Sequence, residues 1–320
     1  NLTIDRYEIC NVIGPDEFHD GYPGAKEPGI NNNAYTNFMV AWIFWQTLEM
    51  LAILPEDRLN FIREDVGLTD DEVKLWDEIG HKLRIPFHDG TIISQFEGYG
   101  DLKDFDWKAY RDKYGKILRL DRILEAEGDS TNSYKVSKQA DLLMLFYLLS
   151  SDQIRKLFER LGYQFDHETI PKNIDYYLQR TSHGSTLSRI VHAWVLSRSH
   201  RDLSWNLFCD TLESDVKDVQ GGTTQEGIHL GAMAGTIDII LRCYSGIECR
   251  GDTLIFNPGL PKELKSVQFY IKYRKNWINV TITPSKIKLS SRISRYMPVK
   301  ISIDHTTFFL APGETREVEL

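Results

Sequence analysis

The sequence predicts a mainly α-helical fold that ends in a small β-sandwich. Up to about Gly246, apolar residues recur at helical spacing, and only short polar breaks separate the segments. After Gly246 the apolar segments are short and rich in β-branched and aromatic residues. This change places a boundary near Glu248 to Asp252, so we expect a helical domain over residues 1–248 and a β-domain over 249–320.

Eight helical segments are expected before the boundary. The segment 32–54 stops at Pro55, and the segment 69–83 opens with a threonine N-cap followed by acidic residues, which suit the positive end of a helix dipole. The other six cover residues 137–149, 151–161, 167–181, 186–199, 202–219 and 227–244. Because most of them follow one another without an intervening strand, they indicate stacked helical hairpins, either a bundle or an α/α barrel.

Seven short strands are expected after the boundary, over residues 253–256, 267–273, 277–283, 286–292, 299–303, 307–310 and 314–320. Turn formers such as Asn257-Pro258-Gly259 and Pro312-Gly313 separate them. Short strands at this spacing are typical of an antiparallel sandwich.

Composition excludes several classes of function. The net charge of −8 argues against nucleic acid as a partner, because phosphate backbones are bound by clustered Lys and Arg. The most apolar stretch, residues 38–54, is interrupted by Gln46 and Glu49, so it predicts a buried core helix and not a membrane span. The four cysteines lack metal-ligand spacing, so no metal is expected. No charged-then-apolar leader is visible, which favours a cytoplasmic protein.

Two polar clusters stand where a ligand could meet them. Gly14-Pro15-Asp16-Glu17-Phe18-His19 forms a loop that can project a carboxylate, although a solvated loop before an Asn-capped helix explains it equally well. Lys138, Gln139 and Asp141 open a very apolar helix and suit hydrogen bonding to sugar hydroxyls. Ordinary first-turn polarity is the alternative.

Two further clusters precede helices and suit an anion. Ser182-His183-Gly184-Ser185-Thr186-Leu187-Ser188 combines hydroxyls, an imidazole and the free N–H groups of a helix N-terminus. Its alternative is an N-cap with a bystander histidine. Gly221-Gly222-Thr223-Thr224 can bring backbone amides close to a ligand, or can be a flexible linker.

Together these motifs resemble glycoside hydrolase family 65, which includes maltose, trehalose, kojibiose and nigerose phosphorylases. The resemblance rests on Gly-Pro-Asp-Glu-Phe-His, Asn-Asn-Ala-Tyr-Thr-Asn, Lys-Gln-Ala-Asp, His-Gly-Ser-Thr-Leu-Ser and Gly-Thr-Thr-Gln-Glu-Gly-Ile-His-Leu-Gly, in this order. It implies that the helices are the later half of an (α/α)6 barrel, followed by the β-sandwich.

The resemblance also assigns roles to single residues. It makes Glu17 the general acid that protonates the glycosidic oxygen. The residues expected to bind the sugar are Lys138, Gln139, Gln95, Glu97 and His19. The residues expected to surround inorganic phosphate are His183, Ser185, Thr186, Ser188, Gly222 and Thr223.

The implied reaction is inverting phosphorolysis of an α-glucosyl disaccharide to β-glucose 1-phosphate and a free sugar. An inverting hydrolase needs a second carboxylate to activate water, whereas phosphate is already an anionic nucleophile and needs an anion site instead. Phosphate is thus a co-substrate, and no other cofactor is expected. For Glu17 to donate a proton near neutral pH, its pKa must be raised by burial or by a nearby negative charge.

Two other functions stay open. One is an inverting disaccharide hydrolase in which Glu226 is the base, and the other is a non-catalytic carbohydrate-binding fragment. Family members are usually more than twice this length, and a Trp-Asp pair ahead of the acid loop holds the glucosyl unit. We therefore expect this chain to need a missing N-terminal half for activity, and the resemblance also suggests a homodimer.

Overall fold

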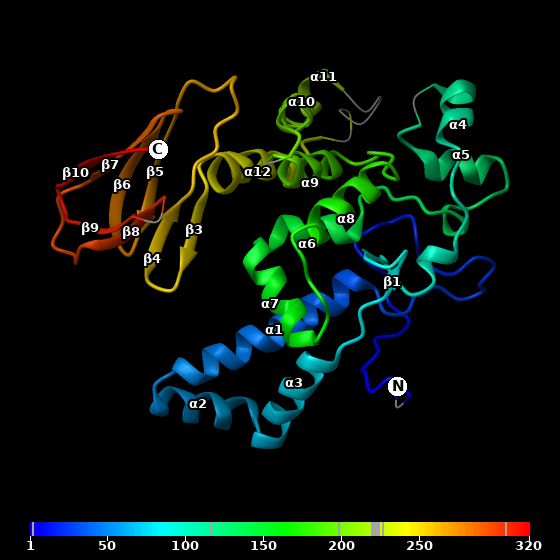
Figure 1. Cartoon of the computed structure of the whole chain (residues 1–320), viewed down its shortest axis with the longest axis horizontal. Coiled ribbons are helices and arrows are strands. Elements are labelled where there is room, and N and C mark those ends of the chain that lie inside the picture. The colour runs from blue at the N-terminus through cyan, green and yellow to red at the C-terminus, as the bar shows by residue number, and fades with distance from the viewer. Residues whose placement is uncertain (2, 116, 198, 219–224, 226, 305) are drawn as a thin grey trace. The chain divides into compact units, whose positions relative to one another are not determined.

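The computed structural model describes residues 1–320 except 2, 116, 198, 219–224, 226 and 305. By their contacts the described residues form two compact units, Asn1–Val191 and His192–Leu320 (Figure 1). No helix among the described residues is long and apolar enough to cross a membrane.

The first unit is built mainly from helices. They are α1 (Ala34–Ile53), α2 (Glu56–Val66), α3 (Asp70–Lys82), α4 (Trp107–Tyr114), α5 (Leu120–Ala126), α6 (Asp141–Leu148), α7 (Ser151–Leu161) and α8 (Thr169–Leu178), with α9 (Thr186–Leu196) crossing the division between the units. Strands β1 (Phe87–His88) and β2 (Ile92–Ile93) form a short antiparallel pair. Two short 3₁₀ turns complete it, η1 (Tyr99–Asp101) and η2 (Thr131–Ser133).

Local signals set several of these helix ends as the sequence predicts. The Asn33 side chain accepts the N–H of the third residue of α1, and the helix ends before Pro55. Thr69 caps α3 in the same way. Ser150 and Gln153 form a reciprocal capping box at the start of α7.

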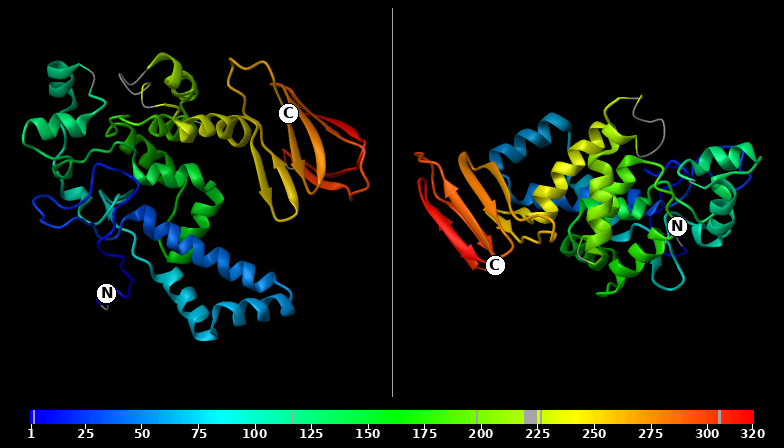
Figure 2. Two further views of the ribbon diagram at one scale, coloured as in Figure 1. Left: turned by 180° about the vertical axis from the view of Figure 1, so that it is seen from behind. Right: turned by 90° about the horizontal axis from the view of Figure 1, so that it is seen from above.

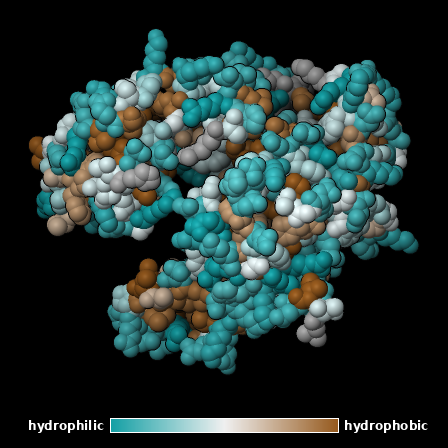
Figure 3. Space-filling view, in the orientation of Figure 1, coloured by the Kyte–Doolittle hydropathy of each residue, from teal (hydrophilic) through white to brown (hydrophobic). Residues whose placement is uncertain are grey.

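Helix α1 packs against α3, α6 and α7, but only in part is it the buried core helix that the sequence predicts. The ring of Phe38, in α1, stacks on the ring of Phe158, in α7, with centroids 5.3 Å apart. Further along, Met50 is 49% and Ile53 is 81% exposed, because α3 and α7 cover one side of the helix only. Figure 3 shows apolar residues on the surface at the lower left, over α1 and α2.

Helix α6 begins at Asp141 and not at residue 137, which corrects the predicted start. The reason is a tertiary contact: Ser137 donates its N–H to the Arg180 carbonyl and accepts the N–H of Ser182. Lys138 and Gln139 therefore lie in the segment before the helix. Helices α2, α4 and α5 are not predicted, because these stretches are polar and lack a clear apolar period.

The second unit joins helices to two sheets. The helices are α10 (Arg201–Leu212), α11 (Ser214–Lys217), α12 (Leu230–Asp238) and the π-helix η4 (Ile239–Tyr244). The single helix predicted over 202–219 is thus interrupted at Glu213, and the helix predicted from residue 227 begins at Leu230. The strands are β3 (Ile247–Arg250), β4 (Thr253–Phe256), β5 (Val267–Tyr273), β6 (Asn276–Ile282), β7 (Lys286–Ser291), β8 (Val299–Ile303), β9 (Thr306–Leu310) and β10 (Thr315–Glu319).

These strands confirm the predicted sandwich, with one departure. The sheet orders are β10-β7-β6-β5 and β3-β4-β8-β9, and Figure 2 shows them as two layers. Alternate residues of both layers, such as Phe256, Val280 and Ile301, share one apolar core. The departure is that β4 pairs with β8 in parallel, so the sandwich is not wholly antiparallel. Strand β3 was not predicted.

Candidate active site

The loop that carries Glu17 is held by a buried carboxylate, Asp141, at the start of α6. Asp141 Oδ1 accepts the backbone N–H of Asp16 at 2.5 Å, and its Oδ2 accepts the side-chain amide of Asn33 at 2.6 Å. In return, Asp16 Oδ1 accepts the N–H of Lys138 at 3.0 Å. Both carboxylates are 2% exposed. These bonds join the acid loop to the Lys138 segment and to the first turn of α1.

The structure gives Asp141 a role that the sequence did not assign. Both of its carboxylate oxygens accept hydrogen bonds from within the protein, so it braces the acid loop. The sequence signal for such a brace is an aspartate in the first turn of an otherwise apolar helix. Asp16 and Asn33, which also hold the acid loop in place, lie within the motifs that the resemblance rests on, but the sequence analysis assigned neither of them a role.

Burial, and after it the neighbouring Asp16 carboxylate, raises the pKa of Asp141 well above its ordinary value. The hydrogen bonds from Asn33 and Asp16 oppose this shift. Asp141 therefore takes up a proton more readily in the folded chain than in an unfolded one.

Glu17 itself lies at the surface of this loop. Its side chain is 68% exposed and its Oε2 lies 2.6 Å from Lys138 Nζ, whose side chain is 14% exposed. The burial expected of a general acid is thus not seen at Glu17 in this structure. What the structure does provide is an exposed carboxylate on a hydrogen-bonded loop, next to a largely buried cation.

Two of the predicted sugar-binding residues brace the same loop. Gln139 donates its side-chain amide to the Pro15 carbonyl at 3.1 Å, and Gln95 Oε1 accepts the N–H of Asp141 at 2.7 Å. Each also keeps one buried polar atom without a partner among the described residues, Oε1 of Gln139 and Nε2 of Gln95. Such atoms are where a hydroxyl or a water would find a hydrogen bond.

The other two predicted sugar-binding residues have different surroundings. His19 is 2% exposed beneath the loop, where its Nε2 lies 3.0 Å from the Tyr134 carbonyl oxygen and its ring contacts Phe96. Glu97 pairs with Arg84 at 2.7 Å and accepts an amide hydrogen bond from Asn32 at 2.8 Å. In this structure both serve the packing and charge balance of the loop's base.

The predicted phosphate loop forms a tight turn at the start of α9. His183 has a φ of +55°, and its Nδ1 lies 3.1 Å from Ser188 Oγ. Ser185 Oγ accepts the N–H of Leu187 at 3.2 Å, as a capping hydroxyl does. Only a glycine fits at 184, because a Cβ there would lie 2.2 Å from the Leu118 carbonyl oxygen. Thr186 and Ser188 are buried.

Backbone pairing places this loop beside the Lys138 segment. Ser182 donates its N–H to the Ser137 carbonyl at 2.9 Å, and the hydroxyls of Ser137 and Thr181 are 2.9 Å apart. The structure therefore brings together three of the four predicted clusters: the acid loop, the Lys138 segment and the His183 loop. The predicted residues Gly222 and Thr223, and the alternative base Glu226, lie outside the described residues.

A first prediction concerns the proton on Asp141. The pKa of Asp141 in the folded chain lies above its unfolded value of about 3.9, so folding takes up a proton at any pH between these two pKa values. The free energy of unfolding therefore falls as pH rises through this range, by up to about 1.4 kcal/mol per pH unit. Urea unfolding at a series of pH values should give a shallower fall for Asp141→Asn. The exposed Asp175→Asn is the control and should keep the native slope. Equal slopes in all three chains would contradict the assignment.

A second prediction concerns Gly14. A Cβ at this position would lie 2.0 Å from Asp141 Oδ2 and 2.4 Å from Asn33 Nδ2, so Gly14→Ala must push the acid loop off its brace. We expect the free energy of unfolding to fall by roughly 1–3 kcal/mol. Gly21→Ala, in the same loop with no contact closer than 3.5 Å, should change it by less than about 0.5 kcal/mol. If the Gly14→Ala chain were as stable as the native one, the side chains of Asp141 and Asn33 would have to move aside without loss of stability, and the prediction would be wrong.

Comparisons with known proteins agree with this geometry. The family model for the glycosyl hydrolase family 65 central catalytic domain matches residues 1–238, and the model for the C-terminal domain of that family matches residues 247–313. An uncharacterized glycosyl hydrolase of Mycobacterium tuberculosis is 50% identical over 313 residues, which are 98% of this chain and 24% of that protein.

Two further relatives have names that state an activity. The trehalose 6-phosphate phosphorylase of Lactococcus lactis is 37% identical over 287 residues, 89% of this chain and 36% of that protein. The structure of a putative kojibiose phosphorylase from the human microbiome shares the fold, with a TM-score of 0.74 at 22% identity, over 100% of this chain and 39% of that one. The chain thus spans between a quarter and two fifths of the length of these relatives. Since the catalytic-domain model covers most of the sequence, this chain belongs to glycosyl hydrolase family 65.

Proposed function

We propose that this chain carries the acid loop and the phosphate loop of an inverting phosphorylase that cleaves an α-glucosyl disaccharide into β-glucose 1-phosphate and a free sugar. The observation that supports it most is the convergence of an outward-facing carboxylate, Glu17, with a cation and a hydroxyl-rich helix N-terminus. The named activities of its family relatives, both phosphorylases, point the same way.

In the proposed reaction a phosphate oxygen attacks the anomeric carbon from the face opposite the leaving sugar. The bond from that carbon to the glycosidic oxygen breaks, and Glu17 passes its proton to this oxygen. Attack from the opposite face converts the α-linkage into a β-phosphate ester. Phosphate needs no general base, so one carboxylate suffices. The bound sugar would also cover Glu17 and separate it from Lys138, which supplies the burial that proton donation requires.

The His183 loop has the chemistry to hold phosphate for this attack. The loop leads into the N-terminus of α9, which is the positive end of the helix dipole, where an anion is favoured. The hydroxyl of Ser185 and the ring of His183 are only partly buried, whereas Ser188 is fully buried behind them and orients the imidazole. Inorganic phosphate is a co-substrate in this proposal, and no other cofactor takes part.

Two alternatives are distinguished by their dependence on phosphate. In a hydrolase with Glu226 as base, free glucose would be released equally without phosphate. A non-catalytic carbohydrate-binding protein would bind disaccharide and release neither product. The hydroxyl-rich loop favours the phosphorylase, since a water nucleophile needs no such cradle. We also propose a cytoplasmic homodimer, which cell fractionation and light scattering would test.

The central test is release of glucose 1-phosphate from a panel of α-linked glucose disaccharides, with and without phosphate, by the natural polypeptide that contains this sequence. Product should appear only with phosphate, and Glu17→Gln should lower its rate by roughly 10²–10⁴-fold because the leaving oxygen is no longer protonated. The control is Glu27→Gln, at an exposed residue in the segment that follows the acid loop, and it should keep the native rate. Free glucose formed without phosphate would instead establish the hydrolase.

The phosphate loop has a test of its own. His183→Asn removes a donor to the anion and should raise the KM for phosphate about 10-fold or more, with little change in the KM for disaccharide. His167→Asn, at a side chain that is 89% exposed, should leave both constants unchanged. If His183→Asn altered only the KM for disaccharide, the loop would belong to the sugar site.

A further inference from the structure

Positive charge is concentrated in one part of the second unit. Residues 264–303 contain no Asp or Glu, although the whole chain has a net charge of −8. Their nine cations are Lys265, Lys272, Arg274, Lys275, Lys286, Lys288, Arg292, Arg295 and Lys300. An uneven distribution of this kind indicates a surface that meets negative charge.

Four of these cations lie in two connections at one end of the sandwich. Arg274 and Lys275 form the turn between β5 and β6, and the loop 292–298 between β7 and β8 contains Arg292 and Arg295. The start of β6 pairs with the end of β7, so the turn and the loop lie at the same end. The helix η4 leads into β3 at the opposite end, because the first residue of β3 pairs with the last residue of β4.

A buried amide joins the turn to the loop. Asn276 is 1% exposed, and its side chain donates to the carbonyls of Arg274 at 3.3 Å and Met297 at 3.0 Å. Its Oδ1 accepts the hydroxyl of Ser294 at 2.7 Å. Residues 274–275 and 292–298 therefore form one surface, which we call the basic end of the sandwich.

The two cations of the turn stand where side chains are unfavourable. Arg274 has a φ of +44° and Lys275 a φ of +67°, so both have a left-handed backbone. A two-residue hairpin turn of this kind favours Asn and Gly, and other side chains make it less stable. A turn that only reversed the chain would not need two cations here, which indicates that their charge has a function.

Aromatic rings support the cations without neutralising them. Lys275 Nζ lies 5.8 Å from the centre of the Tyr296 ring. The Arg292 guanidinium lies 5.4 Å from the centre of the Tyr270 ring and 5.8 Å from that of the Trp277 ring. Such contacts limit the movement of a cation and leave its charge available to a partner.

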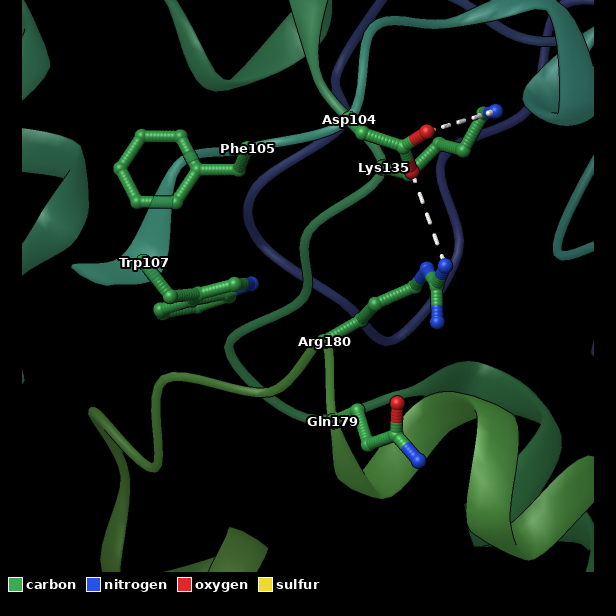
Figure 4. A pocket seen from close by; sticks show the side chains of 6 residues that line it. All are labelled: Asp104, Phe105, Trp107, Lys135, Gln179 and Arg180. Carbon is green, nitrogen blue, oxygen red and sulfur yellow. Dashed lines mark ion pairs between the residues drawn. The ribbon is translucent and has the colours of Figure 1, made fainter. Parts of the chain in front are cut away.

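Neighbouring cations in the first unit offer a comparison, because a carboxylate pairs with both of them. In a pocket of about 220 Å³, Asp104 lies 3.8 Å from Lys135 Nζ and 3.6 Å from Arg180 Nη2, and Figure 4 shows both ion pairs. The charge of that cluster is partly balanced by its own carboxylate.

The charge of the basic end is not balanced in this way. Among the residues that the structure describes, none of its four cations forms an ion pair with a carboxylate. Two acids lie in the other connections at this end, and both have partners. Asp252 pairs with Lys300 at 3.3 Å, and Glu314 Oε2 accepts a backbone N–H at 2.8 Å. An anionic partner would supply the missing counter-charge.

Apolar side chains stand among these cations and are nearly fully exposed. Ile293 is 92% and Met297 is 80% exposed, on either side of Arg295 in the sequence. Single exposed apolar residues are common on protein surfaces, but two on one short loop that also carries cations are not explained by charge alone. Cations beside protruding alkyl groups suit the boundary between lipid headgroups and acyl chains.

We propose that the basic end of the sandwich binds the surface of an anionic phospholipid bilayer. Lipid phosphate and carboxylate groups would pair with the four cations, and Ile293 and Met297 would enter the acyl boundary. An acidic protein would match the charge but not the two alkyl side chains, and a neutral bilayer would do the reverse. The inference uses no residue of the candidate active site and does not rest on the proposed function.

The test is co-sedimentation of the natural polypeptide that contains this sequence with two kinds of vesicle. One is phosphatidylcholine alone, and the other is phosphatidylcholine mixed with phosphatidylserine. Binding to the mixed vesicles should be at least about 10-fold stronger, and added salt should weaken it. Equal binding to both vesicles, or binding to neither, would overturn the proposal.

A first variant tests the charge. Arg274→Gln together with Lys275→Gln should weaken binding to the mixed vesicles roughly 25-fold, since each cation near an anionic surface contributes about 5-fold. The control is Lys286→Gln together with Lys288→Gln, which removes the same charge from lysines that pair with Glu317. If the control weakened binding as much, net charge and not the basic end would decide, and the proposal would be wrong.

A second variant separates lipid from an acidic protein. Ile293→Ser together with Met297→Ser keeps every charge and should weaken binding to the mixed vesicles about 10-fold or more. Ile53→Ser, at an 81% exposed residue of α1, should leave it unchanged. Native binding by the double variant, or competition by polyglutamate as strong as that by mixed vesicles, would make the basic end a docking site for an acidic protein.

Discussion

The candidate site depends on the carboxylate of Asp141. This carboxylate accepts hydrogen bonds from the backbone N–H of Asp16 in the acid loop and from the side chain of Asn33, which caps α1. The backbone N–H of Asp141, at the start of α6, donates to Gln95 Oε1. Burying a carboxylate costs free energy unless donors or a proton compensate it. Here two N–H groups donate to the carboxylate, and burial raises its pKa, so a proton binds to it more readily than in an unfolded chain. One buried group thereby fixes the position of three elements.

The next constraint is the pairing of Ser137 with the stretch around Thr181. It keeps residues 137–140 out of α6 and carries Lys138 to Glu17, and it holds the turn at His183 against the same segment. Glu17 and the His183 loop are thus attached to one backbone ladder. Small shifts in this ladder would move both of them together, which preserves their separation.

Many helix ends and the motif loops could be predicted from the sequence, because local interactions set them. Caps such as Asn33 and Thr69, and the loop glycines, act within a few residues, so helix ends and motif loops could be located from sequence. The brace between Asp16 and Asp141 joins residues 125 positions apart, so the sequence marks an aspartate in the first turn of an apolar helix but does not identify its partner. The same limit explains α6, whose start is set by a tertiary pair. It also explains α1, whose apolar surface exceeds what α3 and α7 cover.

The distribution of charge gives the last step. A chain with a net charge of −8 repels anions at long range, so cations held at fixed points decide where phosphate can stay. The segment before α6 supplies one such cation, Lys138, which lies beside Glu17. The proposed reaction has a single anionic reactant, inorganic phosphate, so one fixed cation next to the predicted general acid is enough to favour it there.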